Sequence, residues 1–397
     1  MNKEKFAHRS SLVLIAVFCV ILALAMLSGF ILTDDQYSFY ENRNLAAFPE
    51  LTLDGVMDGS YFTALDTYIK ERSAAREGFL RLSTFIDLYL LRRPVVNDVV
   101  ITRDTLLPFN DFEVVSDYNV NYYSQEIANN LKSHTDLVES YGGSFYYVAV
   151  PCQYVCKSGD YPWYLNNRSE YTEATRAALF PMLEEAGIEY IDMLRYCEEN
   201  DYPDSYSSNI DNHFSITGGY ATYLEIIERI NSDGKFSLDP LTEGEYSYSE
   251  VEKRYLGSRT RKIFDMWDIT EPIGIMTVDE DIPFTRYNWG SEGASTVYHI
   301  PGEDEQYATY GVYMGGDISE TVIKTERPDL PSILVYGDSF TNAVESLIWY
   351  NFDTMYSLDL RHYDEMDLES YIEKFKPDIV VCIRDYQALL SPWYNGQ

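Results

Sequence analysis

The sequence is poor in basic residues and lacks the common patterns that bind metals or phosphates. Of 397 residues, 30 are Lys or Arg and 64 are Asp or Glu, which gives a formal net charge of -34. Because this charge repels the phosphate backbone of DNA and RNA, we exclude nucleic-acid binding. The sequence has no His-Glu-x-x-His motif, EF-hand loop, Cys-x-x-Cys pair or glycine-rich phosphate loop, so we expect no metal and no cofactor. The five cysteines leave disulfide pairing open.

An apolar run without charges follows a basic N-terminus. Residues 1–10 carry Lys3, Lys5 and Arg9 against Glu4, and residues 11–32 contain no charged side chain. Such a run is long enough to cross the hydrocarbon core of a bilayer, and the basic residues before it favour a cytoplasmic N-terminus. We therefore expect a single-pass membrane protein. Residues 1–10 would be cytoplasmic, residues 11–32 would form a transmembrane signal anchor, and the remaining residues would lie on the extracytoplasmic side. Cleavage of the anchor stays open.

The rest of the sequence alternates apolar strands with amphipathic helices. Residues 33–110 are expected to form a linker and an N-terminal helical region, and residues 111–397 an α/β domain. Its continuously apolar strands predict a parallel sheet covered by helices on both faces. An aromatic-rich insertion of hairpins and loops is expected at about 238–329, where Gly, Pro and Asp are frequent. The expected strands are 142–151, 188–193, 332–339, 355–363 and 378–383, and the expected helices include 119–141, 170–186, 216–230 with Thr217 as its cap, and 368–375.

Two short motifs fall where strands of this sheet are expected to end. The segment YGDSF at 336–340 follows a strand and opens a helix, which would aim Ser339 outward above free backbone N–H groups. The segment DNHF at 211–214 offers His213 as a base and Asp211 as the carboxylate that orients it. Either motif alone has an ordinary explanation as a helix-start residue. Because active sites of such sheets lie at the carboxyl ends of the strands, the two motifs together favour a Ser-His-Asp triad.

These residues resemble the SGNH-hydrolase superfamily. Their order along the chain, with Asp and His before Ser, resembles the permuted arrangement of alginate O-acetylation proteins of the AlgX and AlgJ type. The sequence is still more similar to the DHHW protein family, over nearly the whole chain after the anchor. It departs from the Asp-His-His-Trp of that family at Asn212 and Phe214. The similarity is carried by ENR at 41–43, DNHF at 211–214, LGS at 256–258, YMGG at 313–316, the Ser339 segment, and LDLR at 358–361 followed by Tyr363.

The resemblance implies an SGNH-hydrolase-like, flavodoxin-like α/β domain that carries out acyl transfer. Ser339 would attack an acyl donor, His213 would take its proton and Asp211 would hold the imidazole. The backbone N–H of Ser339 would be one donor to the oxyanion.

A second oxyanion donor and a substrate-binding residue are also expected. Gly315 or Gly316 is the candidate donor, because a glycine turn lets the backbone approach a substrate closely, and Asn342 is the alternative. Plain turn or helix roles stay open for all three. Arg361 is a candidate for binding a carboxylate or a sugar, and a surface ion pair is an equal alternative.

The resemblance and the anchor together suggest an extracytoplasmic O-acyltransferase, with acetyl as the expected group. Its expected acceptor is a cell-surface polysaccharide, which fits an aromatic content of 15% with 36 Tyr. Its expected partner is a multispanning membrane O-acyltransferase that supplies the acyl group. Two alternatives stay open: a carbohydrate esterase or deacetylase with the same triad, and a non-catalytic glycan-binding or scaffold protein of the cell envelope.

Overall fold

The computed structural model describes residues 11–21, 23, 36–73, 76–109, 116–200 and 206–391. The chain divides into two compact units. The first consists of Met1–Asn97 and Thr260–Trp267, and the second of Asp98–Arg259 and Asp268–Gln397. All residues expected to carry chemistry belong to the second unit.

The expected anchor is described only in part. Residues 11–21 are helical and exposed, whereas residues 22 and 24–32 lie outside the described residues. Among the residues that the structure describes, no helix has both the length and the apolar character needed to cross a membrane.

Short helices and ion pairs build the described part of the first unit. Glu41 accepts from Arg76 (2.8 Å to Nη2) and from Arg43 (3.3 Å), and Arg43 also donates to Glu71 (2.7 Å). These contacts attach a two-stranded ribbon to the helices that follow it. The elements are β1 (Tyr37–Ser38), β2 (Arg43–Asn44), α2 (Leu53–Asp58), α3 (Ser60–Glu71), α4 (Arg76–Phe85), the π-helix η1 (Ile86–Leu90) and β3 (Val95–Val96).

An eight-stranded sheet forms the centre of the second unit, in the order β11-β10-β12-β14-β13-β15-β6-β7. The five strands from β14 to β7 run parallel to one another, as the apolar strand pattern predicts. Their bounds are β6 (Ser144–Val150), β7 (Tyr190–Asp192), β13 (Ser332–Gly337), β14 (Thr354–Asp359) and β15 (Ile379–Asp385). β14 thus ends four residues before the expected strand end at residue 363.

The insertion is more closely tied to the sheet than we expected from its loop-like composition. β12 (Glu320–Lys324) pairs antiparallel with β14, and β10 (Thr285–Asn288) and β11 (Ser291–Glu292) continue the sheet beyond it. These strands cover the β14 edge, which would otherwise expose unpaired backbone groups. A separate antiparallel pair, β8 (Tyr246–Glu250) with β9 (Gly274–Val278), fits the expected hairpin-like character.

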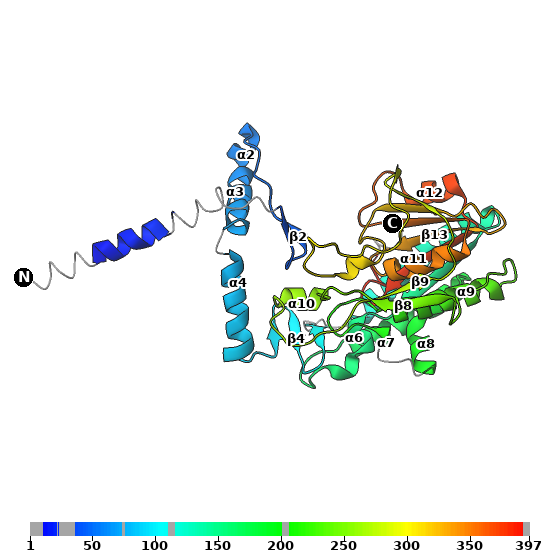
Figure 1. The fold of residues 1–397 in the computed structure, drawn as a ribbon, viewed down its shortest axis with the longest axis horizontal. Coiled ribbons are helices and arrows are strands. Elements are labelled where there is room, and N and C mark those ends of the chain that lie inside the picture. Colours follow the sequence, from blue (N-terminus) through cyan, green and yellow to red (C-terminus); the bar gives the residue numbers. More distant parts are fainter. Residues whose placement is uncertain are drawn as a thin grey trace, which may run out of the picture. The chain divides into compact units, whose positions relative to one another are not determined.

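Helices cover both faces of the parallel strands (Figure 1). Tyr336 of β13 contacts His134 of α5, and Tyr356 of β14 packs against Tyr371 of α12, so these helices share one face. α5 also packs against α7, whereas α11 packs against α9 and contacts β13. The helix bounds are α5 (Asp117–Ser140), α6 (Gln153–Cys156), α7 (Ser169–Ala186), α8 (Met193–Glu199), α9 (Ile216–Ser232), α10 (Ser258–Lys262), α11 (Thr341–Ile348) and α12 (Leu368–Phe375).

We expected Thr217 to cap α9, but the cap is Ser215. The Ser215 hydroxyl accepts the backbone N–H groups of Thr217 (3.1 Å) and Gly218 (3.3 Å). An extended residue just before the helix can satisfy these first-turn donors, whereas Thr217 already lies inside the helix. The helix begins at Ile216, as expected, and only the identity of its cap differs.

Candidate active site

Ser339 lies in a tight turn between β13 and α11. The neighbouring Asp338 fixes this turn, because its Oδ1 accepts the Phe340 N–H at 2.9 Å and its carbonyl accepts the Thr341 N–H at 2.9 Å. Its Oδ2 lies 2.7 Å from Nη1 of Arg384, a side chain that is fully buried. The turn leaves the Ser339 side chain at the carboxyl end of the sheet, as expected. The N–H groups of Phe340 and Thr341 are not free, however, which corrects our expectation of several open donors at this helix start.

The structure brings Ser339, His213 and Asp211 into one line of hydrogen bonds. His213 Nε2 lies 2.8 Å from Ser339 Oγ, and His213 Nδ1 lies 2.6 Å from Asp211 Oδ1. With Nδ1 donating to the carboxylate, Nε2 is left as the acceptor for the serine proton. The residues come from a loop before α9 and a turn after β13, 126 positions apart in sequence. This geometry is the one that a serine nucleophile, its base and an orienting carboxylate require.

Asp211 is held as an anion although it is buried. Burial alone would raise the pKa of its carboxyl, but the facing His213 side chain and the N–H groups of Ser258 and His213 outweigh burial and hold the pKa well below its usual range. The Ser258 N–H donates to Asp211 Oδ2 at 2.6 Å, and the His213 N–H donates to Oδ1 at 3.1 Å. A carboxylate fixed in this way can stabilise a positive charge on the imidazole.

Three neighbours that sequence reasoning did not assign complete this arrangement. Tyr310 stacks on the His213 ring, with ring centroids 3.8 Å apart and planes 6° apart. Ser258 Oγ donates to Asn212 Oδ1 at 2.7 Å, which turns the Asn212 amide towards His213 Nε2, 3.4 Å away. Phe214, which replaces the Trp of the family motif, is buried and packs against Phe340. Ser258 and Phe214 lie in the LGS and DNHF segments, which the family resemblance had singled out, whereas Tyr310 gave no signal in the sequence.

Gly257 brings Ser258 into reach of Asp211. A Cβ on Gly257 would lie 2.3 Å from the carbonyl oxygen of Ile210. Only glycine therefore lets the backbone pass close enough for the Ser258 N–H to reach the carboxylate.

A cavity of about 340 Å³ opens beside Ser339. Polar side chains from several loops line it, and its volume suits a small ligand or one end of a longer one. The lining residues are Cys152, Asn212, Asp338, Ser339, Phe340, Arg361, Asp385, Gln387, Ala388 and Ser391.

Arg361 lines this cavity, whereas the three candidate oxyanion residues do not. Its guanidinium contacts Asp359 (2.6 Å) and Asp317 (2.9 Å). Burial would lower the pKa of Arg361, but these carboxylates more than offset burial and raise it. Arg361 thus combines both roles considered from the sequence: it is ion-paired, and it presents a cation to the cavity. Asp317, Asp359 and His362 are spaced closely enough for a metal ion, but Arg361 already faces both carboxylates.

Of the candidate oxyanion donors, Gly315 and Gly316 lie in a turn and Asn342 lies in α11. Gly315 and Gly316 both have positive φ (81° and 92°), and the Gly316 N–H donates to the Tyr313 carbonyl at 3.0 Å. Asn342 Nδ2 donates to Asp317 Oδ1 at 3.3 Å. Their role as second oxyanion donor stays a prediction.

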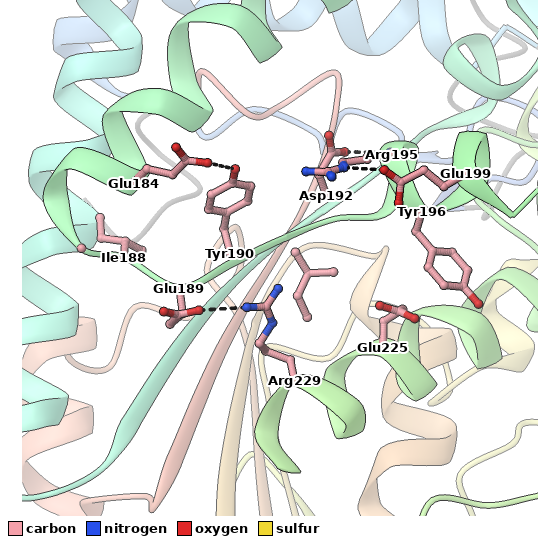
Figure 2. A pocket seen from close by; sticks show the side chains of 12 residues that line it. Glu184, Ile188, Glu189, Tyr190, Asp192, Arg195, Tyr196, Glu199, Glu225 and Arg229 are labelled. Carbon is pink, nitrogen blue, oxygen red and sulfur yellow. Dashed lines mark hydrogen bonds and ion pairs between the residues drawn. The ribbon is translucent and has the colours of Figure 1, made fainter. Parts of the chain in front are cut away.

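A second cavity of about 550 Å³ lies beside β7 (Figure 2). Its charged side chains largely satisfy one another: Arg229 pairs with Glu189 at 3.1 Å, and Arg195 with Glu199 at 2.8 Å. Among the described residues, its lining contains no serine, cysteine or histidine. The larger cavity is therefore a poor place for nucleophilic chemistry, and the smaller one beside Ser339 is the candidate active site.

The α/β sheet thus carries a hydrogen-bonded line of Ser339, His213 and Asp211 at the carboxyl ends of its parallel strands. The sequence model for DHHW protein matches residues 41–157 of this chain. The resemblance to the DHHW family is therefore confirmed over these residues, which include the ENR segment but not Asp211, His213 or Ser339. No curated protein matches the sequence.

Two solved structures share this fold, and a third is less similar. PatB1 of Bacillus cereus, in a structure with a sulfonyl adduct, matches with a TM-score of 0.61 at 16% identity, over 75% of this chain and 98% of that chain. A DHHW family protein from Eubacterium siraeum matches with a TM-score of 0.54 at 14% identity, over 75% and 93% of the two chains. The O-acetyltransferase domain of Pseudomonas putida AlgJ matches with a TM-score of 0.47 at 13% identity, over 74% and 92%.

Proposed function

We propose that the chain is a membrane-anchored, extracytoplasmic SGNH-type O-acyltransferase that moves an acyl group, expected to be acetyl, onto a cell-surface polysaccharide. The anchor at residues 11–32 would hold it at the cell membrane as a single-pass protein. A multispanning membrane O-acyltransferase would supply the acyl group.

The observation that carries this proposal is the hydrogen-bonded line from Ser339 through His213 to Asp211. In the first half-reaction, Ser339 Oγ attacks the acyl carbon of the donor while His213 Nε2 takes its proton and returns it to the leaving group. In the second, an acceptor hydroxyl attacks the acyl carbon on Ser339. Its proton passes through His213 to the departing Ser339 Oγ. Asp211 holds the imidazole in the required tautomer and stabilises its charged form.

Two further facts support this assignment. A sulfonyl adduct has been obtained with PatB1, which shares this fold, and sulfonyl electrophiles react with activated nucleophiles. The Asp-x-His and Gly-Asp-Ser motifs resemble those of alginate O-acetylation proteins, which is the source of the acyl-transfer assignment.

A carbohydrate esterase is the second candidate, because water can replace the acceptor hydroxyl at the same acyl-enzyme. The test is acetyl release from a chromogenic ester by the full-length chain in detergent, with Ser339→Ala and His213→Ala beside it. We expect release that both variants abolish, together with labelling of the wild type by a sulfonyl fluoride. Equal rates in all three proteins and no labelling would reject both candidates and favour the glycan-binding or scaffold alternative.

A further inference from the structure

Asp385 lies in the candidate active site but has no role in the proton chain described above. β13 and β15 are parallel neighbours in which Gly337 pairs with Ile383. Ser339 lies two residues beyond Gly337, and Asp385 lies two residues beyond Ile383. Both line the same cavity of about 340 Å³. Asp385 is therefore placed beside the nucleophile by the register of the sheet.

The carboxyl group of Asp385 is only partly satisfied by the protein. The Gln387 N–H donates to its Oδ1 at 2.8 Å, and no other hydrogen bond reaches this carboxyl group within the described part of the chain. Its neighbour Arg384 faces Asp338 at 2.7 Å. Only 7% of Asp385 is exposed, so the cavity is where its second oxygen can find a partner.

The surroundings of Asp385 keep it close to the balance between its two protonation states. Burial and the charge of Asp338 together raise the pKa of Asp385 to about 7, although Arg384, the Gln387 N–H and His213 act in the opposite direction. Cys152, Tyr147 and Tyr154 are also close enough to Asp385 to interact with it electrostatically, and Arg361 lines the same cavity. A hydroxyl group is the ligand that suits both states, because it donates to a carboxylate and accepts from a carboxylic acid.

We propose that Asp385 is the acceptor-binding residue of this cavity, where it holds one hydroxyl group of a polyhydroxylated acceptor while a neighbouring hydroxyl attacks the acyl group on Ser339. This inference rests on the proposed function. It adds a residue that would favour transfer to an acceptor over hydrolysis, because it binds the acceptor. The bond between the acceptor oxygen and the acyl carbon forms, and the bond between the acyl carbon and Ser339 Oγ breaks. The proton of the attacking hydroxyl moves to His213 Nε2 and then to Ser339 Oγ. Asp385 exchanges no proton in this step and acts by position alone.

The experiment compares acceptors that carry one hydroxyl group with acceptors that carry several. The full-length chain is loaded with acetyl from a chromogenic ester in the presence of methanol, glycerol or cellotetraose, and acetylated products are separated from free acetate. The variants are Asp385→Asn, which keeps the size of the side chain, and Asp385→Ser, which keeps a hydroxyl. The matched control is Asp329→Asn, an exposed residue before β13 at the opposite edge of the sheet.

For the wild type we expect transfer to glycerol or cellotetraose to exceed transfer to methanol per hydroxyl group. In Asp385→Asn we expect kcat/KM for the polyhydroxylated acceptors to fall roughly tenfold to a hundredfold, the size expected for one hydrogen bond to a charged group. Most of this change should appear in KM, and it should exceed any change in ester cleavage or in transfer to methanol. The control should behave as the wild type.

Each other outcome has a defined meaning. If the wild type does not cleave the ester, the proposed function fails and the inference falls with it. If the wild type cleaves the ester but transfers no better to glycerol or cellotetraose than to methanol, or if Asp385→Asn and Asp385→Ser keep full transfer, the inference alone is overturned. If Asp385→Asn loses ester cleavage as well, Asp385→Ser decides: cleavage without polyol transfer supports the inference, and loss of both overturns it.

Discussion

Replacing Asp211 by Asn tests the central element of the site with almost no change in size. In the wild type, Asp211 Oδ2 accepts the Ser258 N–H at 2.6 Å, and Oδ1 accepts both His213 Nδ1 (2.6 Å) and the His213 N–H (3.1 Å). An Asn side chain has one oxygen for these donors. If that oxygen faces Ser258, the amide NH₂ points at Nδ1 and favours the tautomer with a proton on Nε2. If the oxygen faces His213, the NH₂ opposes the Ser258 N–H. Both orientations weaken the base.

The expected magnitude follows from the tautomer. When Nε2 of His213 carries a proton, it cannot accept one from Ser339. In Ser-His-Asp triads, the replacement of Asp by Asn typically lowers kcat by about 10⁴-fold for this reason. At 1.36 kcal/mol per factor of ten, the barrier rises by about 5.5 kcal/mol. KM should change little, because Asp211 does not line the cavity.

The assay is initial-rate cleavage of a chromogenic acetyl ester by the full-length chain, with thermal unfolding measured on the same preparations. The exposed Asp329→Asn variant is the matched control for the same chemical change. A folded Asp211→Asn protein that retains activity within tenfold of the wild type would refute the assignment of Asp211 as the residue that orients His213.

Three further changes probe the surroundings of the triad. Tyr310→Ala should lower kcat about tenfold, because it removes the ring stacked on the imidazole. Tyr310→Phe should retain activity, because the Tyr310 hydroxyl has no hydrogen-bond partner among the described residues. Equal ester kinetics for the two variants would contradict this role of Tyr310. Gly257→Ala should lower kcat roughly 100-fold, because a Cβ 2.3 Å from the Ile210 carbonyl must displace the neighbouring Ser258 N–H from Asp211; an unaffected rate would show that this contact is dispensable. Burial raises the pKa of Glu345 from 4.5 to about 7, so the folded state binds the proton more tightly than the unfolded state, and stability falls as pH rises from about 4.5 to about 7. Glu345→Gln should therefore raise the free energy of unfolding by up to about 3 kcal/mol at pH 8 and by little at pH 5, as measured by denaturant titration; the same gain at both pH values would contradict ionisation of Glu345 as the cause.

The sequence alone was sufficient to predict that Ser339, His213 and Asp211 lie close together. Apolar strands separated by helices specify a parallel sheet, and the carboxyl ends of such strands meet at one edge. Ser339 follows one of these strands directly, so its position needed no knowledge of the remaining contacts. His213 was identified as a candidate because it is one of five histidines and has Asp211 two positions away.

The supporting residues could not be predicted in the same way. Tyr310 lies in a short 3₁₀ turn in the insertion, and nothing in its local sequence shows that it will stack on His213. β10 has four residues and pairs with β12 across a long loop, so its membership of the main sheet depends on long-range pairing and not on local pattern. Arg384 is fully buried against Asp338 near the end of a strand that is apolar up to Ile383, and a strand pattern does not reveal the partner of such a charge.

Two carboxyl groups in this site are both buried, yet their pKa values are shifted in opposite directions. For Asp211, burial is outweighed by His213 and by two backbone N–H groups, and the pKa falls. For Asp385, burial is reinforced by the negative charge of Asp338, and the pKa rises to about 7. The difference thus comes from the neighbours and not from the depth of burial. A permanently ionised group suits the stabilisation of an imidazolium, whereas a group near neutrality can bind a hydroxyl in either protonation state. This difference in pKa is the physical reason for assigning the two carboxyl groups different roles within one candidate active site.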